Sequence, residues 1–184
     1  MTGEQRWHVL DKRLVADRSP FARAYDLDLR LPDGRVITNW LQVDLPPFVI
    51  TFPVLANGSV IFVRQYRQVI GDYALELTAG HMEEDELPQA AAARELLEEG
   101  GAVAEDWQFL GRYVMDANRG CGWAHVFLAR GAQIVAPSNS GDVGEMSVHL
   151  LPMAEVRRRW LAGEFVSAPT ALAIGLALGA LGSE

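Results

Sequence analysis

Cysteine and positive charge are both scarce in this sequence. Cys121 is the single thiol among 184 residues, which excludes an internal disulfide and is typical of a reducing compartment, so we expect a cytoplasmic location. Only 16 Lys and Arg stand against 24 Asp and Glu, a net charge of -8. Because nucleic-acid surfaces need clustered cations, the composition argues against a nucleic-acid partner.

Long hydrophobic runs are also absent. The longest apolar tract, Ala171 to Leu181, is too short to cross a bilayer and contains glycines, so it predicts a buried C-terminal helix. The opening segment, MTGEQRWHVLDKR, lacks the apolar core of a secretory signal, and we expect no membrane partner. With 49% hydrophobic and 22% charged residues, the chain has the composition of a globular domain with an appendage.

An acidic helix is the most informative feature that the sequence does contain. It lies within Gly80 to Ala102, GHMEEDELPQAAAARELLEEGGA. Pro88 suits its first turn, the alanines and leucines favour helix, and a glycine pair suits its end. At about 100° per residue, Glu95, Glu98 and Glu99 share an arc roughly 100° wide.

Three like charges on one helix face repel one another by roughly a few tenths of a kcal/mol per pair. A solvated surface is the ordinary explanation of such a face. The alternative is a site for a hard divalent cation, Mg²⁺ or Mn²⁺, which carboxylates bind together with substrate phosphates. The spacing leaves both explanations open. Beside the arc, Leu96, Ala92 and Ala93 are expected to pack on a sheet.

The stretch resembles the Nudix box, G-x5-E-x7-R-E-U-x-E-E-x-G-U, where U is apolar. Every fixed position is met, although Ala102 is smaller than the usual aliphatic residue; the matching residues are Gly80, Glu86, Arg94, Glu95, Leu96, Glu98, Glu99, Gly101 and Ala102. The resemblance implies an enzyme that hydrolyses a pyrophosphate joined to a nucleoside, with divalent cations that neutralise the diphosphate and orient the attacking water.

The remaining chain predicts strands around three helices. Consecutive prolines break a ladder, so Leu45-Pro46-Pro47 indicates a boundary between a small antiparallel sheet, residues 1–46, and a Nudix domain, residues 47–184. This order is of the α/β class, and the resemblance implies an α/β/α sandwich with a mixed sheet. The expected strands are residues 7–16, 22–31, 36–43, 48–55, 60–65, 73–77, 107–116, 124–129 and 145–151, and the later helices are 152–162 and 169–181.

The resemblance also assigns roles to the acids. Glu95 and Glu99 would bind the metal directly. Glu98 would bind a second ion, directly or through water, and so take part in catalysis. The carbonyl of Ala79 would supply a further oxygen. Mg²⁺ is the expected cofactor, and Mn²⁺ is possible.

Two other box residues, Glu86 and Arg94, would hold the loop and the helix by charge-assisted hydrogen bonds. In related enzymes a mobile loop before the last strand supplies the glutamate that accepts a proton from water. Here Glu145 takes that catalytic place, with Asp142 as second choice. A solvated loop acid is the alternative.

Outside the box, the resemblance narrows to ADP-ribose pyrophosphatases and related nucleotide-sugar hydrolases. It rests on VRQYR, residues 63–67, and ELTAG, residues 76–80, where Thr78 replaces the usual proline. In that group the second arginine, here Arg67, contacts the diphosphate, because a guanidinium can bind two phosphate oxygens. An ordinary salt bridge is the alternative. Glu76 would bind the terminal sugar or support the metal loop.

The N-terminal sheet fits the same group, whose members exchange such an extension in a homodimer and sandwich adenine between aromatic side chains. Trp40 and Phe48 are the candidates here, with Trp7 less favoured; aromatic residues are otherwise core or interface residues. Arg119 could meet a phosphate or a sugar hydroxyl. Ala117 stands where a proline is typical, so we expect a freer loop and looser selectivity.

We therefore expect a homodimer acting on a small nucleoside diphosphate sugar, first of all ADP-ribose, with AMP and ribose 5-phosphate as products. GDP-mannose or another nucleotide sugar is the alternative substrate. A non-catalytic, ligand-sensing Nudix domain is the alternative class, although such domains usually lose box glutamates. A thiol nucleophile at Cys121 with His125 lacks a third orienting group.

Overall fold

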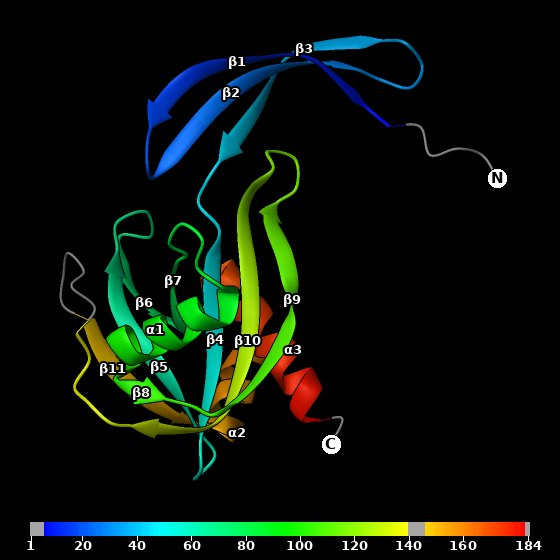
Figure 1. Cartoon of the computed structure of the whole chain (residues 1–184). Helices are drawn as coiled ribbons and strands as arrows, with labels where there is room; N and C mark the ends of the chain where they lie inside the picture. The colour runs from blue at the N-terminus through cyan, green and yellow to red at the C-terminus, as the bar shows by residue number, and fades with distance from the viewer. Residues whose placement is uncertain (1–5, 140–145, 183–184) are drawn as a thin grey trace. The chain divides into compact units, whose positions relative to one another are not determined.

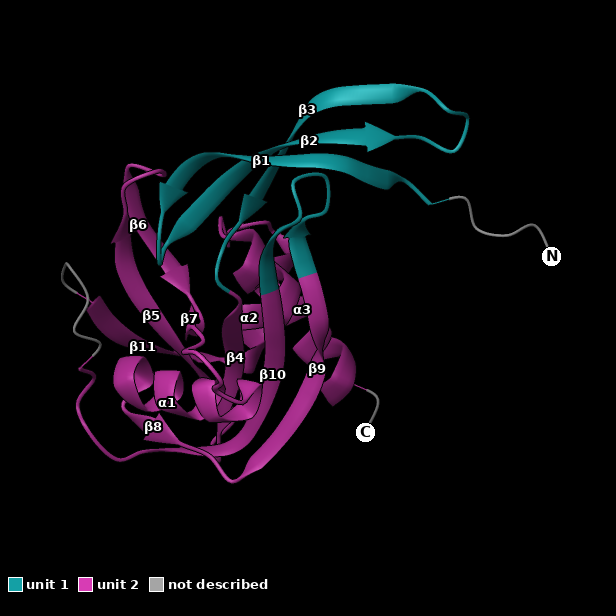
Figure 2. Cartoon of the chain, turned by 45° about the horizontal axis from the view of Figure 1, so that its top comes forward, with its two compact units in different colours: residues 1–46, 114–123 teal, residues 47–113, 124–184 magenta. Residues whose placement is uncertain are grey.

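The computed structural model describes residues 6–139 and 146–182. They fall into two compact units, shown in different colours in Figure 2. We call the first, residues 1–46 and 114–123, the N-terminal unit, and the second, residues 47–113 and 124–184, the main unit. Each is described by itself below.

The N-terminal unit is built on a three-stranded antiparallel sheet in the order β1-β2-β3, with β1 (His8–Arg18), β2 (Ala22–Arg30) and β3 (Val36–Asp44). Leu27 and Leu29 on the central strand are its buried apolar residues. The segment 114–123 joins this unit through a hydrogen bond from the Val43 N–H to the Arg119 carbonyl, 3.0 Å long. The sheet therefore has the strands that the sequence predicts.

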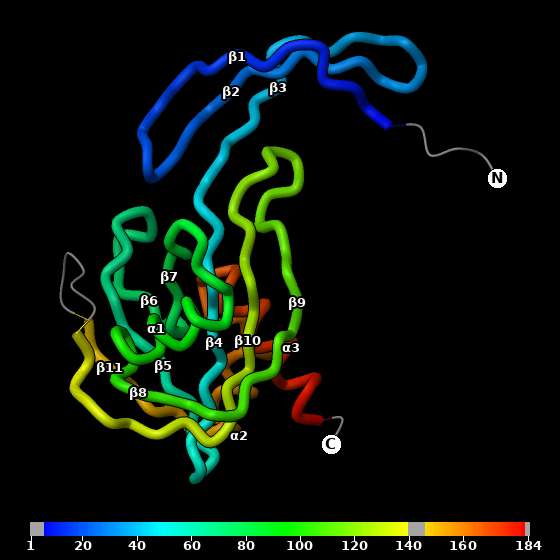
Figure 3. The backbone as a smooth tube through the Cα atoms, viewed as in Figure 1, coloured from blue at the N-terminus to red at the C-terminus, as the bar shows by residue number. Residues whose placement is uncertain are grey.

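The main unit contains a mixed sheet whose central strands are β11-β5-β4-β10-β8. β4 and β10 run parallel, whereas the other neighbours are antiparallel. β6 pairs with β5, β7 with β4, and β9 with β10, and the chain path can be followed in Figure 3. The strands are β4 (Phe48–Leu55), β5 (Ser59–Arg67), β6 (Asp72–Glu76), β7 (Thr78–His81), β8 (Ala102–Val103), β9 (Asp106–Asp116), β10 (Cys121–Ile134) and β11 (Met146–Pro152).

Helices cover both faces of this sheet (Figure 1). α1 (Pro88–Gly100) packs its Ala91, Ala92 and Leu96 on one face. On the other face, α2 (Met153–Leu161) and α3 (Ala168–Leu181) enclose the larger core with β4 and β5. The α/β/α sandwich with a mixed sheet, predicted from the sequence, is confirmed.

Local details differ from the sequence expectations. Ala92 and Leu96 are buried on α1 as expected, but Ala93 is exposed and Ala91 is buried instead. The short strands β7 and β8 were not predicted, because two to four residues carry no readable periodicity. In the part of the chain that the structure describes, no helix combines the length and the apolarity that crossing a bilayer requires.

The end of α1 depends on Gly101. Its φ of 62° is left-handed, its N–H bonds back to the last turn, and its carbonyl accepts hydrogen bonds from Val135 and Ala136. A Cβ at this position would collide with the carbonyl oxygen of Ala136. Glycine is therefore required here for its conformation and for the space it leaves.

We predict that Gly101→Ala lowers the free energy of unfolding by more than about 2 kcal/mol, since left-handed strain of about 1–2 kcal/mol adds to the collision. Gly131→Ala is the matched control, because φ there is 63° and no atom lies within 4 Å of the added Cβ. Urea unfolding of both variants measures the difference. Equal losses would contradict the steric part of the prediction.

Candidate active site

One cavity of about 480 Å³ brings together the predicted metal and diphosphate residues. Its walls come from β4, from the segment β5 to β7, from the acidic face of α1 and from the first turn of α3. Six residues singled out in the sequence line it: Arg67, Glu76, Ala79, Glu95, Glu98 and Glu99. Phe48, one of the two aromatic residues predicted to stack on adenine, also lines the cavity.

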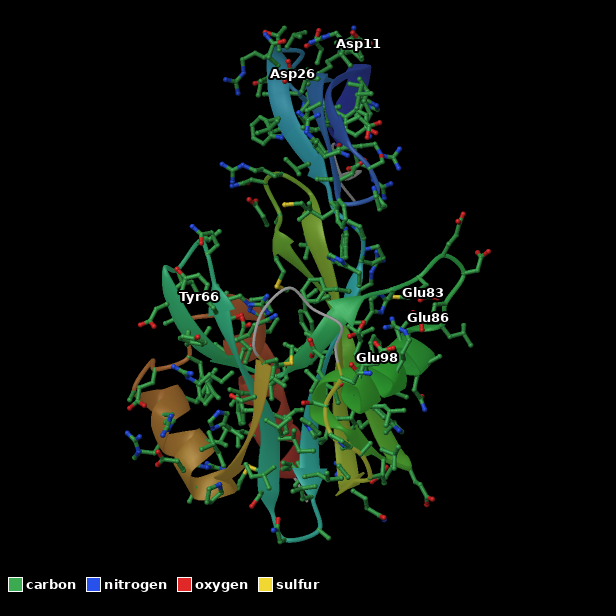
Figure 4. All side chains as sticks on the ribbon, turned by 90° about the vertical axis from the view of Figure 1, so that its left-hand side faces the viewer. Asp11, Asp26, Tyr66, Glu83, Glu86 and Glu98 are labelled. Carbon is green, nitrogen blue, oxygen red and sulfur yellow. The ribbon has the colours of Figure 1, made fainter. Side chains whose placement is uncertain are left out.

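The acids of α1 are organised by the Arg94 guanidinium. Its Nη1 bonds Glu95 at 2.7 Å and Glu98 at 3.1 Å, and its Nε and Nη2 bond the two oxygens of Glu86 at 3.0 Å each. Nη2 also donates to the His81 carbonyl. Figure 4 labels Glu86, on the loop before the helix, and Glu98, on the helix. Arg94 therefore ties the loop, β7 and the helix together.

Charge and burial compete at these carboxylates. Hydrogen bonds from Arg94 lower the pKa of Glu86. Burial raises the pKa of Glu95, and the hydrogen bond from Arg94 opposes that effect. Carboxyl groups are rarely buried unless they are paired or serve a function, and Glu95 and Glu99 are both below 10% exposed.

Backbone groups of β7 position the two buried acids. The Ala79 N–H donates to Glu99 Oε2 at 2.8 Å. Gly80 faces Glu95, and a Cβ built at position 80 would overlap the Glu95 carboxylate. The first glycine of the box is thus explained by close approach of the strand backbone to the helix acid.

Arg67 and Glu76 form an ion pair in the cavity wall. Arg67 Nε donates to Glu76 Oε2 at 2.6 Å, and Nη2 lies 2.5 Å from the same oxygen. The pair joins the end of β5 to the end of β6. Glu76 thus orients the guanidinium, and two nitrogens directed at one oxygen leave the other edge of the plane available to a second anion.

The donor set suits a hard divalent cation: three carboxylates and a backbone carbonyl at one cavity. Among the described residues, however, no three acidic, His or Cys side chains converge closely enough to hold an ion by themselves. Arg94 draws Glu95 and Glu98 toward itself, and Glu99 bonds Ala79. Since Mg²⁺ commonly uses one or two carboxylates plus water and substrate phosphates, the residues fit a site that the substrate completes.

Other predicted residues lie elsewhere. Trp40 and Arg119 belong to the N-terminal unit and are not among the residues lining this cavity. The Trp40 ring meets Trp7 edge to face, with 5.8 Å between ring centroids, and its indole N–H donates to the Asn118 carbonyl. Arg119 pairs with Asp116 at 2.6 Å. Glu145 and Asp142 lie outside the described residues. The functional roles of these residues stay predictions.

Sequence reasoning missed one wall of the cavity. Pro169 and Thr170, in the first turn of α3, and Ser167, just before the helix, line it together with the box residues. No local motif marks them, because α3 reaches the cavity through tertiary packing alone. The one available signal was a Ser-Ala-Pro-Thr start to an otherwise wholly apolar helix.

The family follows from the site and from comparison with known proteins. A family model described as NUDIX domain matches residues 46–168. The chain therefore belongs to the Nudix family and is a Nudix hydrolase, which confirms the prediction from the box.

Individual known proteins are similar to this chain. The chain is 34% identical over 145 residues to ADP-ribose pyrophosphatase of Mycobacterium tuberculosis (strain ATCC 25618 / H37Rv), covering 76% of this chain and 68% of that protein. Over 170 residues it is 27% identical to ADP-ribose pyrophosphatase of Bacillus subtilis (strain 168), covering 90% and 91%. A crystal structure of an ADP compounds hydrolase matches with a TM-score of 0.84 over 97% of this chain and 96% of that one; at 22% identity it shows the shared fold.

We predict that Gly80→Ala keeps the fold but lowers turnover at least ~10-fold, since small displacements of catalytic groups are costly. The new methyl group displaces the flexible end of Glu95 and meets no rigid backbone within the three nearest contacts. Gly179→Ala on α3 is the control, because no atom lies within 4 Å of its Cβ. Thermal unfolding and turnover of both variants are to be compared. Full activity of Gly80→Ala would show that the close approach has no catalytic consequence.

Proposed function

We propose that this Nudix hydrolase cleaves the pyrophosphate bond of a nucleoside diphosphate sugar, with ADP-ribose as the leading substrate. AMP and ribose 5-phosphate are then the products. The observation that carries the proposal is the single cavity that holds both the acidic face of α1 and the Arg67–Glu76 pair. The names of the two pyrophosphatase relatives support the choice of substrate.

In the proposed reaction, Arg67 binds the diphosphate while Glu76 holds its guanidinium in place. Glu95 and Glu99, with the Ala79 carbonyl, would hold a divalent cation, for which we propose Mg²⁺, and Glu98 would hold a second one. When bound, the ions neutralise the diphosphate and lower the pKa of the attacking water. Arg94 keeps the acids of the helix in place during turnover.

A proton acceptor is also required. We propose Glu145 for this role, since it precedes β11, where related enzymes carry such a glutamate on a loop. The base of the nucleotide would stack on an aromatic ring, for which Trp40 and Phe48 are the candidates, and Arg119 would contact phosphate or sugar. GDP-mannose or another nucleotide sugar remains the alternative substrate, and a ligand-sensing domain the alternative class.

The function is tested by incubating the protein with Mg²⁺ and ADP-ribose, ADP-glucose or GDP-mannose, and measuring product release by chromatography. We expect ADP-ribose to be preferred by no more than about tenfold, the size of 1–2 kcal/mol differences between pockets. Glu99→Gln should reduce turnover at least ~100-fold because it removes an oxygen ligand.

The exposed loop acid Glu105, outside the cavity, supplies the control variant Glu105→Gln, which keeps wild-type turnover. No hydrolysis of any nucleotide sugar by the wild-type protein would refute the enzyme proposal and favour the sensing domain. Full activity of Glu99→Gln at saturating Mg²⁺ would refute the ligand role. A thousandfold preference for GDP-mannose would overturn the leading substrate.

We also propose a homodimer formed through the N-terminal unit. Apolar side chains stay exposed along its thin sheet, a pattern that marks interaction surfaces; they include Val9, Leu10, Leu14, Val15, Phe21, Val36 and Leu41. The sheet would lie across a partner subunit related by a two-fold axis, and the partner would cover these side chains.

We predict that light scattering gives twice the chain mass of 20.2 kDa at micromolar concentration. Leu14→Asp places a charge among the exposed apolar residues of β1 and should shift the protein toward the monomer. Leu161→Asp, at a more exposed position at the end of α2, is the control and should leave the mass unchanged. A wild-type monomer would remove the proposed dimer.

A further inference from the structure

The chain changes its sheet partner between β6 and β7. Glu76, the last residue of β6, pairs with Val63 on β5, whereas Thr78, the first residue of β7, pairs with Thr51 on β4. Leu77 lies between the two strands, belongs to neither, and is 1% exposed. A backbone N–H at such a break is buried without a ladder partner, and buried N–H groups need an acceptor.

The acceptor comes from α3, far along the chain. The Thr170 hydroxyl oxygen lies 3.5 Å from the Leu77 nitrogen and accepts its N–H, at the long end of the hydrogen-bond range. Thr170 is the third residue of α3 and is 1% exposed. In a helix interior a threonine hydroxyl often bonds the carbonyl four residues earlier. At Thr170 that residue precedes the helix, so the hydroxyl can instead interact with the backbone at Leu77.

The residues on either side of this break carry the site chemistry. Glu76 orients Arg67, and the Ala79 N–H holds Glu99. Leu77 itself and Thr170 also line the cavity. A displacement of the backbone at Leu77 therefore moves both Glu76, which orients Arg67, and Ala79, which holds Glu99.

We propose that Thr170 is a positioning residue for hydrolysis: its hydroxyl fixes the backbone at Leu77 and so sets Glu76 and Ala79 relative to the acidic helix. This role rests on the proposed function, because the reaction it would support is the one proposed above. If Thr170 has this role, loss of its hydroxyl lowers the turnover number and not only the stability. The reason is that Glu76 and Ala79, which hold Arg67 and Glu99, would both shift.

The test compares Thr170→Val, which keeps the shape but removes the acceptor, with Thr170→Ser, which keeps the acceptor. Thr51→Val is the matched control. Thr51 is 0% exposed on β4, and its hydroxyl has no hydrogen-bond partner among the described residues. Each full-length variant is assayed for kcat and KM with ADP-ribose and Mg²⁺, for thermal unfolding, and for exchange of the Leu77 amide proton by NMR.

For Thr170→Val we expect kcat to fall at least ~10-fold with KM changed less than about 3-fold, and the Leu77 amide to exchange at least ~10-fold faster. Thr170→Ser should stay within about 3-fold of wild-type kcat, and Thr51→Val should match wild type. The amide measurement does not depend on activity.

Three results would overturn the positioning role: wild-type kcat in Thr170→Val, an equal loss of kcat in Thr51→Val, or unchanged Leu77 exchange. A stability loss in Thr170→Val with normal kcat would also overturn it, because it would reduce the hydroxyl to a packing role. If the wild-type protein hydrolyses no nucleotide sugar, the proposed function fails first, and the Leu77 exchange rate alone then decides whether the hydrogen bond exists.

Discussion

The acidic face of α1 depends on one guanidinium. Arg94 lies within 3.1 Å of oxygens from Glu86, Glu95 and Glu98 and also bonds the His81 carbonyl. Unpaired carboxylates in a partly buried wall would be costly, and like charges on neighbouring helix turns repel. Lysine could not replace this arrangement, because it offers a point charge where five acceptor oxygens need a planar set of donors. The residue that looks merely structural in the box therefore determines where the acids point.

The same interaction constrains how cations can bind. Arg94 occupies one oxygen each of Glu95 and Glu98, and the Ala79 N–H occupies one of Glu99, so each acid has part of its coordinating capacity already used. On the proposed function, phosphate oxygens of the substrate would supply the missing ligands.

The sequence predicted the architecture and much of the site for reasons that can be traced to particular residues. Alternation of apolar residues in 22–31, the proline pair at 46–47 and the hairpin signal around Gly58 are local features, and local features determine strands and turns. The box spacing placed Glu95 and Glu99 on one helix face, and both line the same cavity. Glu86 and Arg94 form the charge-assisted bonds that the resemblance implied.

What the sequence did not predict depends on contacts between distant segments. Ala93 is exposed and Ala91 is buried instead, because the packing of Ala91 and Ala92 with Val49 and Phe127 sets the rotation of α1. Thr170 reaches Leu77 across 93 positions of sequence, so no window of residues contains both.

The break at Leu77 shows why such contacts gather at the site. A strand that changes partners leaves backbone groups outside both ladders, and these groups can bond side chains, as Leu77 does with Thr170. The residues beside the break are therefore the ones whose backbone is close enough to the helix acids to hold them: the Ala79 N–H bonds Glu99, and Gly80 leaves room for Glu95. The strand that follows this irregular point thus holds Glu99 by a backbone N–H and leaves room for Glu95.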